Sequence, residues 1–132
     1  MKRIRVMLVG ESWFSESSHF KGFDHFSSGY YETGQEHMRK ALEADGEIEY
    51  MHLPGHLAGE SFPTSMEELS KYDVVILSDI GANSLLLSQG VFVEGKTSVN
   101  RLQLIREWVQ NGGALCMCGG YLSFAGIQAS AK

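Results

Sequence analysis

The sequence predicts an α/β fold, a three-layer sandwich in which helices cover a mostly parallel sheet. The main evidence is that continuous apolar runs alternate along the chain with amphipathic stretches. This alternation is typical of βαβ units, whose parallel strands are joined by right-handed crossovers. The second observation is the length of 132 residues, which is enough for one domain with its own core. We therefore expect a single domain over residues 1–132.

Four apolar runs are predicted to be the strands of this sheet. An uninterrupted apolar run is typical of a strand that is buried on both faces. Glycine or proline, which favour turns, follows three of the four runs directly. The predicted strands are residues 4–9, 48–53, 73–78 and 114–118.

Three helices are predicted between these strands. Thr33 and Glu36 have the spacing of a capping box at the start of the first helix, and Gly46 is its expected stop. Residues 66–69 are expected to form a single helical turn. Ser98 is the expected cap of the third helix, which has an apolar face that should pack on the sheet. The residues of that face are Leu102, Leu104, Ile105, Trp108 and Val109.

Two long segments, residues 11–31 and 79–97, are expected to be loops. Both follow strands, so they gather at the carboxyl edge of the sheet, where ligands bind in open α/β folds. The first is unusually aromatic, which is typical of a loop that lines a pocket or an interface, or of an Ω-loop that packs on the sheet edge. Its aromatic residues are Trp13, Phe14, Phe20, Phe23, Phe26, Tyr30 and Tyr31.

Composition excludes several kinds of partner. The chain has 11 Lys and Arg against 16 Asp and Glu, a formal net charge of −5, and no basic stripe that would bind nucleic acid. No apolar run is long enough to span a bilayer, and the N-terminus does not have the pattern of a signal peptide. We therefore expect a cytoplasmic protein that binds neither nucleic acid nor membrane.

The two cysteines and the histidines predict neither a disulfide framework nor a metal site. Cys116 and Cys118 are expected to point to opposite faces of the last strand and to behave as small buried hydrophobic residues. Helix-breaking residues separate His52 from His56, so the pair does not have the geometry of a helical zinc site. A second cluster, in the first loop, is more typical of solvated side chains, and no cofactor is expected.

The turn after the last predicted strand has the shape of a nucleophile elbow. Gly119 and Gly120 allow the tight turn, which would expose Tyr121, with Ser123 nearby. A tyrosine, with an unperturbed pKa of about 10, is a poor nucleophile for acyl transfer at neutral pH. Because the sequence ends soon after Phe124, the helix expected here is short, and we expect a fragment or a truncated gene product.

Polar residues at the same sheet edge are candidate ligand contacts. Lys21 and Asp24 lie in the first predicted loop, and Asp24 is also a candidate acid–base residue. In the second loop, Gly81 permits unusual backbone angles, so nearby amides either bind an anion or carbonyl oxygen or form an Asx turn. The candidate ligand contacts are Glu11, Ser12, Trp13, Lys21, Asp79, Gly81, Asn83, Gly119 and Gly120.

Several segments resemble the class I glutamine amidotransferase-like family of bacterial cytoplasmic proteins. They read RVMLVGESW, KGFD, LPGH, DVVILSDIGAN and GGYLSF, and together they extend over nearly the whole chain. The resemblance implies a flavodoxin-like sheet, related to class I amidotransferases and to trehalose-utilisation-type proteins. It also implies that members of the family are longer than this chain.

The resemblance does not imply glutaminase activity. Class I amidotransferases carry their nucleophile in a Gly-x-Cys-x-Gly pattern. On that pattern Gly119 takes the first glycine, Tyr121 the cysteine and Ser123 the second glycine. The downstream histidine and glutamate of the triad would lie beyond Lys132.

Three functions remain open from the sequence. The first is binding of a small polar metabolite or a protein partner by a domain that has lost its nucleophile. The second is a hydrolase or isomerase for a sugar-like or carboxylated metabolite, with acid–base groups from Ser12, Asp24, His25 or Tyr121. The third is an interaction module that forms homo-oligomers through uncovered strands. The candidate catalytic residues are Tyr121, Ser123 and Asp24.

Overall fold

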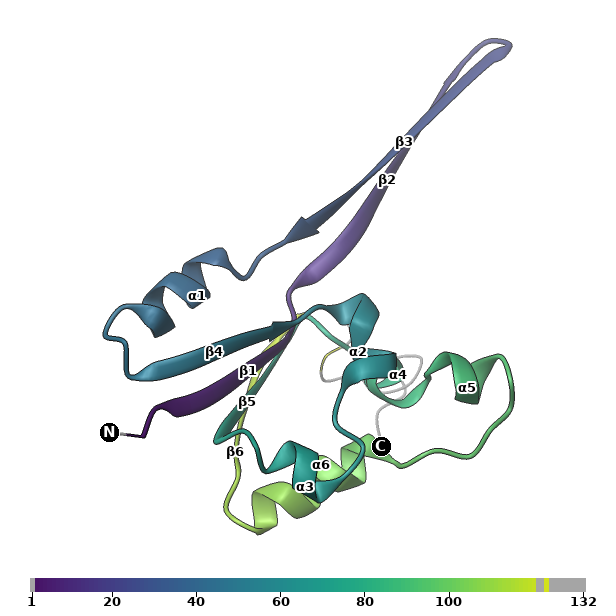
Figure 1. Cartoon of the computed structure of the whole chain (residues 1–132). Helices are drawn as coiled ribbons and strands as arrows, with labels where there is room; N and C mark the ends of the chain where they lie inside the picture. The colour runs from purple at the N-terminus through teal and green to yellow at the C-terminus, as the bar shows by residue number, and fades with distance from the viewer. Residues whose placement is uncertain (1, 121–122, 124–132) are drawn as a thin grey trace.

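The computed structural model describes residues 2–120 and residue 123 of the chain. Its body is a four-stranded sheet with helices on both faces, and a two-stranded hairpin projects from that body (Figure 1). The predicted α/β class and three-layer arrangement are confirmed. Within the described residues, no helix combines the length and the apolar character needed to cross a membrane.

The sheet contains the four predicted strands in the order β4-β1-β5-β6. These are β1 (Ile4–Gly10), β4 (Ile48–Leu53), β5 (Val74–Ser78) and β6 (Ala114–Gly119). All three pairings in this sheet are parallel. The chain passes from β1 to β4 on one side and later to β5 on the other, so the strand order reverses between β1 and β5. Ligands bind at such a reversal in doubly wound sheets.

One face of the sheet is covered by α1 (Glu36–Glu43). Met38 and Leu42 of this helix pack in a small core with Leu8 and Ile76 of the sheet. The helix lies over β4 and β1, at one side of the sheet (Figure 1). Residues of β6 on this face are therefore left exposed by the described part of the chain.

The opposite face carries the larger core, because side chains alternate between the two faces of a strand. Met7 and Val9 of β1 and Val75 and Leu77 of β5 lie on this face. The helices that pack there are α2 (Gly55–Ser61), α3 (Met66–Leu69), α4 (Ala82–Leu86) and α6 (Arg101–Gln110).

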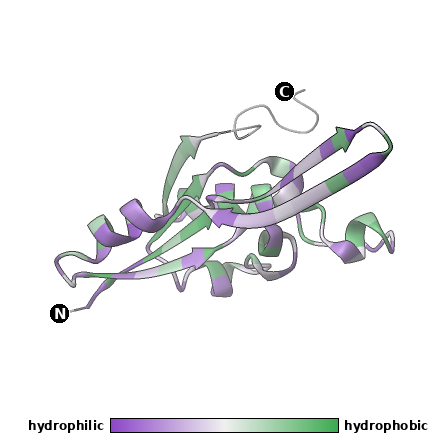
Figure 2. Cartoon of the chain, turned by 90° about the horizontal axis from the view of Figure 1, so that it is seen from above, coloured by the Kyte–Doolittle hydropathy of each residue, from purple (hydrophilic) through white to green (hydrophobic). Residues whose placement is uncertain are grey.

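The expected loop over residues 11–31 is instead an antiparallel hairpin of β2 (Ser12–Lys21) and β3 (Asp24–Thr33). Aromatic residues favour strands, and Gly22, with φ of +64°, supplies the first position of a tight two-residue turn. Hydrophilic and hydrophobic residues are mixed along both of its strands (Figure 2), and nearly all of their side chains are exposed. The loop prediction was wrong because polar residues are mixed with aromatic ones along both strands, so the segment lacks the continuous apolar run by which the other strands were predicted.

Both predicted helix caps were also wrong. Thr33 pairs with Ser12 in the hairpin, so it does not cap α1, which begins after Gln35 without a side-chain cap. Asn100, rather than Ser98, caps α6, because its side-chain oxygen accepts a hydrogen bond from the N–H of Gln103 at 3.1 Å. A cap is set by the backbone geometry at the helix start, which spacing alone does not determine.

The predicted apolar face of α6 is confirmed at its centre. Leu104, Ile105 and Trp108 are buried in the larger core. Leu102 and Val109 are exposed at the margin of that face. The buried apolar face of α6 is therefore narrower than the sequence predicts.

The expected loop over residues 79–97 contains α4 and a further short helix, α5 (Gln89–Phe92). The buried Arg101 side chain holds this region against the body. Its Nη1 donates hydrogen bonds to the backbone carbonyls of Gly59 at 2.5 Å and Leu85 at 3.1 Å. One guanidinium thus joins α2, α4 and α6, a tertiary contact that has no local signal in the sequence.

Cys116 and Cys118 lie on the same face of β6, with their Sγ atoms 3.9 Å apart, and both are exposed. The expectation of opposite faces was wrong, because side chains alternate with a period of two and residues i and i+2 share a face. The expectation of burial was wrong as well, since α1 does not extend over β6.

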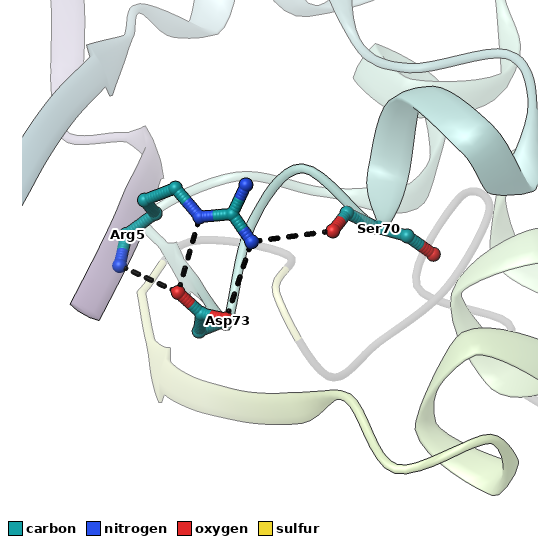
Figure 3. Close-up of polar contacts among 3 residues, drawn as sticks. All are labelled: Arg5, Ser70 and Asp73. Carbon is teal, nitrogen blue, oxygen red and sulfur yellow. Dashed lines mark hydrogen bonds and ion pairs between the residues drawn. The ribbon is translucent and has the colours of Figure 1, made fainter. Parts of the chain in front are cut away.

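An ion pair joins the starts of β1 and β5 (Figure 3). One carboxylate oxygen of Asp73 accepts from the Arg5 backbone N–H at 2.8 Å and from its Nε at 3.2 Å. Nη2 of Arg5 donates to the other carboxylate oxygen at 3.3 Å and to the Ser70 carbonyl at 3.5 Å. These hydrogen bonds from Arg5 lower the pKa of Asp73 to about 2.

We expect Asp73→Ala to destabilise the protein most at neutral pH. An ordinary aspartate has a pKa of about 4, so the ionised pair stabilises the native state fully above that pH. The stabilisation is lost as the pH falls from about 4 towards about 2. The measurement is urea unfolding of both proteins at several pH values. Glu16→Ala, on the exposed hairpin, is the control. A stability difference that does not change between neutral and acidic pH would contradict this role.

Candidate functional site

A cleft of about 450 Å³ opens at the carboxyl ends of β1 and β5, beside the base of the hairpin. Its wall comes from four places in the chain: the start of β2, the start of α2, the segment after β5, and α4. The lining residues are Ser12, Trp13, Gly55, His56, Asp79, Ile80, Gly81, Ala82, Asn83 and Ser84.

The backbone at both strand ends adopts left-handed angles. Gly10 has φ of +101°, and a Cβ at this position would lie 2.0 Å from the carbonyl oxygen of Ser78. Glu11 and Asp79 follow with φ of +49° and +51°. Such angles are uncommon for residues other than glycine and are found at functional sites more often than elsewhere. They turn the chain away from the sheet on both sides of the strand-order reversal.

A partly buried hydrogen bond holds the two strand ends together. The Ser78 hydroxyl donates to Oε1 of Glu11 at 2.5 Å, and the Glu11 backbone N–H donates to the Ser78 carbonyl at 2.9 Å. Glu11 therefore lies beneath the cleft, where it links β1 to β5, and is not among its lining residues.

Trp13 is held at the base of the hairpin. Its Nε1 donates a hydrogen bond to Oε2 of Glu32 at 2.8 Å. A Cβ on Gly34 would lie 3.3 Å from the indole ring and 2.6 Å from a Glu11 carboxylate oxygen. Gly34 thus leaves the space that the indole occupies beside the cleft.

The two glycines of the predicted elbow pack against the opposite wall. The Asp79 backbone N–H donates to the Gly119 carbonyl at 2.7 Å. A Cβ on Gly120 would lie 2.5 Å from the Asp79 Cα, so a side chain there would displace the segment after β5. Gly119 and Gly120 support Asp79 from behind, and they are not among the residues that line the cleft.

His56 completes the wall from the start of α2. Its ring contacts those of Phe14 and Tyr31 edge-on, with centroids 5.3 Å apart in both cases. The adjacent Gly55 backbone N–H donates to the Ser12 hydroxyl at 2.7 Å. The hairpin base therefore positions the imidazole.

Asn83 carries a polar group whose hydrogen bonding is incomplete. Its side-chain oxygen is buried and has no hydrogen-bond partner among the described residues. Leaving a buried acceptor unpaired costs about 1–3 kcal/mol, which a ligand that donates to the reoriented amide would recover.

The structure brings together five of the predicted ligand contacts and separates from them the predicted contact Lys21 and the predicted acid–base residue Asp24. Lys21 and Asp24 pair with each other at the far end of the hairpin, nine residues along β2 from Ser12 and so about 30 Å from the cleft. The expectation that they wall the same pocket was wrong, because residues 11–31 extend as strands and do not fold over the sheet. The predicted contacts that line the cleft are Ser12, Trp13, Asp79, Gly81 and Asn83.

Two of the three predicted catalytic residues, Asp24 and Ser123, lie in the described part of the chain and at different places. Asp24 is at the hairpin turn, and Tyr121 lies outside the described residues. The Ser123 hydroxyl is buried without a hydrogen-bond partner among the described residues, and its backbone N–H donates to the Gly120 carbonyl at 3.4 Å.

His56, Ser84 and Gly55 line the cleft although sequence reasoning did not select them. A signal for His56 exists, since it follows the second predicted strand and so belongs to the same carboxyl edge. His52, in contrast, lies within β4 and hydrogen bonds to the Gly10 carbonyl at 2.7 Å. Among residues 2–120 and 123, no three His, Cys, Asp or Glu side chains are placed to share a metal ion.

Comparison with known proteins places the chain in a family. The family described as "Putative glutamine amidotransferase" matches residues 5–132. Among curated proteins, none matches the chain. The chain belongs to this family, which we call the glutamine amidotransferase-like family.

Two solved structures from Salmonella are similar to this fold. Cytoplasmic Protein STM3548 from Salmonella typhimurium is 44% identical, with a TM-score of 0.85 over 94% of this chain and 50% of its own. Cytoplasmic Protein STM1381 from Salmonella typhimurium LT2 is 40% identical, with a TM-score of 0.85 over 96% of this chain and 51% of its own. The chain thus spans about half the length of these proteins.

We expect Gly10→Ala to destabilise the protein far more than Gly22→Ala. Both glycines have positive φ, but only at Gly10 does a new Cβ meet backbone, the Ser78 carbonyl, whereas nothing lies within 4 Å at Gly22. A left-handed backbone angle alone costs a non-glycine residue about 1–2 kcal/mol, so this is the loss of stability expected for Gly22→Ala. At Gly10 the steric clash adds to that cost, and the total loss of stability should exceed about 3 kcal/mol. The measurement is chemical unfolding of both variants. Equal losses of stability would show that the close approach of β1 and β5 is not required.

Proposed function

We propose that this member of the glutamine amidotransferase-like family binds a small polar metabolite in the cleft and does not hydrolyse glutamine. The observation that carries the proposal is the position of the cleft. It lies at the carboxyl ends of β1 and β5, where the strand order reverses and where doubly wound sheets bind their ligands. The left-handed backbone at both strand ends supports the same location.

The lining indicates the chemical class of the ligand. Of the described residues that line the cleft, none is lysine or arginine, and Asp79 is the one carboxylate among them. An anionic ligand would find no lysine or arginine charge among these described residues to balance its own. Asn83 offers an acceptor, and the rings of Trp13 and His56 offer flat surfaces that suit a sugar-like ring. We infer an uncharged or cationic ligand rich in hydrogen-bond donors, such as a polyol, an amine or an amide.

The absence of glutaminase activity is inferred from the thiols. Neither Cys116 nor Cys118 is among the residues that line the cleft with His56. Partial desolvation of its sulfur, followed by its contact with Cys116, raises the pKa of Cys118, so this thiol stays protonated at neutral pH and is a weak nucleophile. The elbow position itself holds Tyr121 in the sequence.

We place this function in the cytoplasm. The two similar Salmonella proteins are both named as cytoplasmic proteins. The acidic composition of the chain agrees with a small-molecule ligand better than with nucleic acid.

Intrinsic fluorescence offers a direct test, because Trp13 lines the cleft while Trp108 is buried in the core. In a titration panel we expect polyols, amines or amides to change the fluorescence, and phosphate esters to leave it unchanged. Asn83→Leu should weaken the affinity of the ligand found by about tenfold or more, because it removes the amide at nearly equal volume.

Gln110→Leu, at the exposed end of α6, is the matched control and should bind normally. Trp13→Phe should remove the fluorescence change. The proposal fails if no compound in the panel binds, or if Asn83→Leu binds as tightly as the wild type. Release of ammonia from glutamine that is lost in Cys118→Ser would contradict the claim about hydrolysis.

The hairpin favours a second function, which we propose as self-association with another copy of this chain. An isolated two-stranded hairpin is marginally stable in water, yet this one projects from the body (Figure 1). Near its turn Phe20 stacks on His25, and Phe26 on His19, with Phe20 77% exposed. Two identical hairpins present identical surfaces, which suits an isologous dimer.

We expect the wild type to be a dimer or larger in light scattering and the double variant Phe20→Ser with Phe26→Ser to be a monomer. The substitutions remove apolar contact area but keep the backbone pairing of β2 and β3. Ser17→Ala, in the middle of β2, is the control and should not change the mass. A monomeric wild type at high protein concentration would rule out this function.

A further inference from the structure

The two cysteines form a pair on a part of the sheet that none of the described helices covers. Cys116 is in register with Ile76, so both cysteines face the side on which α1 lies over β4 and β1. Their Sγ atoms are 3.9 Å apart, and both residues are exposed. This arrangement differs from that of a lone thiol, because a second thiol is within reach of any adduct formed on the first.

The backbone around Cys118 is irregular. Leu77 of β5 is in register with Met117, but the next residue, Ser78, is in register with Gly119. Cys118 is therefore an extra residue, a bulge, with no partner on β5. Within the described sheet β6 is an edge strand, so its other side is not tied to a neighbour. Bulged edge backbone can bend with the loss of few ladder hydrogen bonds.

This irregularity matters for closing a bond between the thiols. In a regular strand the Cα atoms of residues i and i+2 are about 6.6–6.8 Å apart, at the upper end of the range for disulfides. A disulfide needs the sulfur atoms at about 2.05 Å, so the pair must close by roughly 2 Å from its present separation. Because Cys118 is outside the regular ladder, the backbone there can bend to bring the two sulfur atoms closer.

We propose that Cys116 and Cys118 are a site of reversible modification, a dithiol that a low-molecular-weight disulfide oxidises to an intramolecular disulfide. The Cys116 thiolate attacks one sulfur of the small disulfide, forms a mixed disulfide and releases one small thiol. The Cys118 thiol then loses its proton and attacks the Cys116 sulfur, which releases the second small thiol. Two protein thiols are oxidised, and one small disulfide is reduced to two thiols.

The order of these steps follows from the surroundings of Cys118. Partial desolvation of its sulfur, the neighbouring Cys116 and the charge of Glu11 raise its pKa, which disfavours its thiolate, so we assign it the role of the resolving thiol. The bulge also adjoins the cleft, because Gly119 follows Cys118 and its carbonyl accepts the Asp79 N–H at 2.7 Å.

The test is intact mass spectrometry of the reduced, folded chain after incubation with oxidised glutathione. We expect the wild type to lose the mass of two hydrogen atoms and to keep no glutathione. Cys116→Ser and Cys118→Ser should each keep one glutathione, because neither has a resolving thiol. Peptide mapping should place the wild-type bond between Cys116 and Cys118, and dithiothreitol should reverse it.

Two results would overturn the proposal. One is a wild type that keeps glutathione on either cysteine, which would show that the pair does not close. The other is a wild type that stays fully reduced, or that forms only disulfides between chains. Circular dichroism before and after incubation checks that the chain remains folded, and the wild-type result decides the question even if a serine variant fails to fold.

Discussion

The close approach of β1 and β5 at their carboxyl ends is the constraint on which the rest of the structure depends. The Ser78 carbonyl occupies the space that a side chain at residue 10 would need, so residue 10 must be glycine. The Ser78 hydroxyl then reaches Glu11, and the chain leaves the sheet at Glu11 and Asp79 with left-handed angles. The hairpin departs from one side of this junction and α4 from the other. The cleft lies between the base of the hairpin and α4.

The chemistry of the cleft follows from what surrounds this junction. Elements that are distant in the sequence contribute rings, hydroxyls and one amide, but no positive charge and no thiol among the described lining residues. An amidotransferase elbow requires a cysteine above the sheet. Here Gly119 and Gly120 instead support Asp79 from behind, and the cysteines occupy the face of the sheet on which α1 packs. The proposal of ligand binding without glutamine hydrolysis rests on this arrangement.

The two exposed features of the chain have a common origin in uncovered β-structure. Among the described residues, helix α2 contacts the hairpin only near its base, and β6 is at the edge of the sheet, where α1 does not cover it. Aromatic side chains are exposed on the hairpin, while the paired thiols are exposed on β6. Association and thiol exchange are the reactions that such surfaces favour. The exposed aromatic residues near the hairpin turn and the two thiols are not among the described residues that line the cleft.

The sequence by itself determined the α/β class, the four parallel strands, the apolar centre of α6 and five residues of the cleft. These features were predictable because they depend on local patterns. A continuous apolar run predicts a buried strand, and polar residues that follow parallel strands are expected at the carboxyl edge of the sheet. The tertiary structure alone decided the rest. The hairpin needed the pairing of residues 12–21 with 24–33, Arg101 joined three helices through carbonyls far away in the chain, and His56 was placed by the rings of Phe14 and Tyr31. Such contacts depend on which segments of the chain lie next to each other in the folded protein. The order of residues along the chain does not by itself show which segments these are.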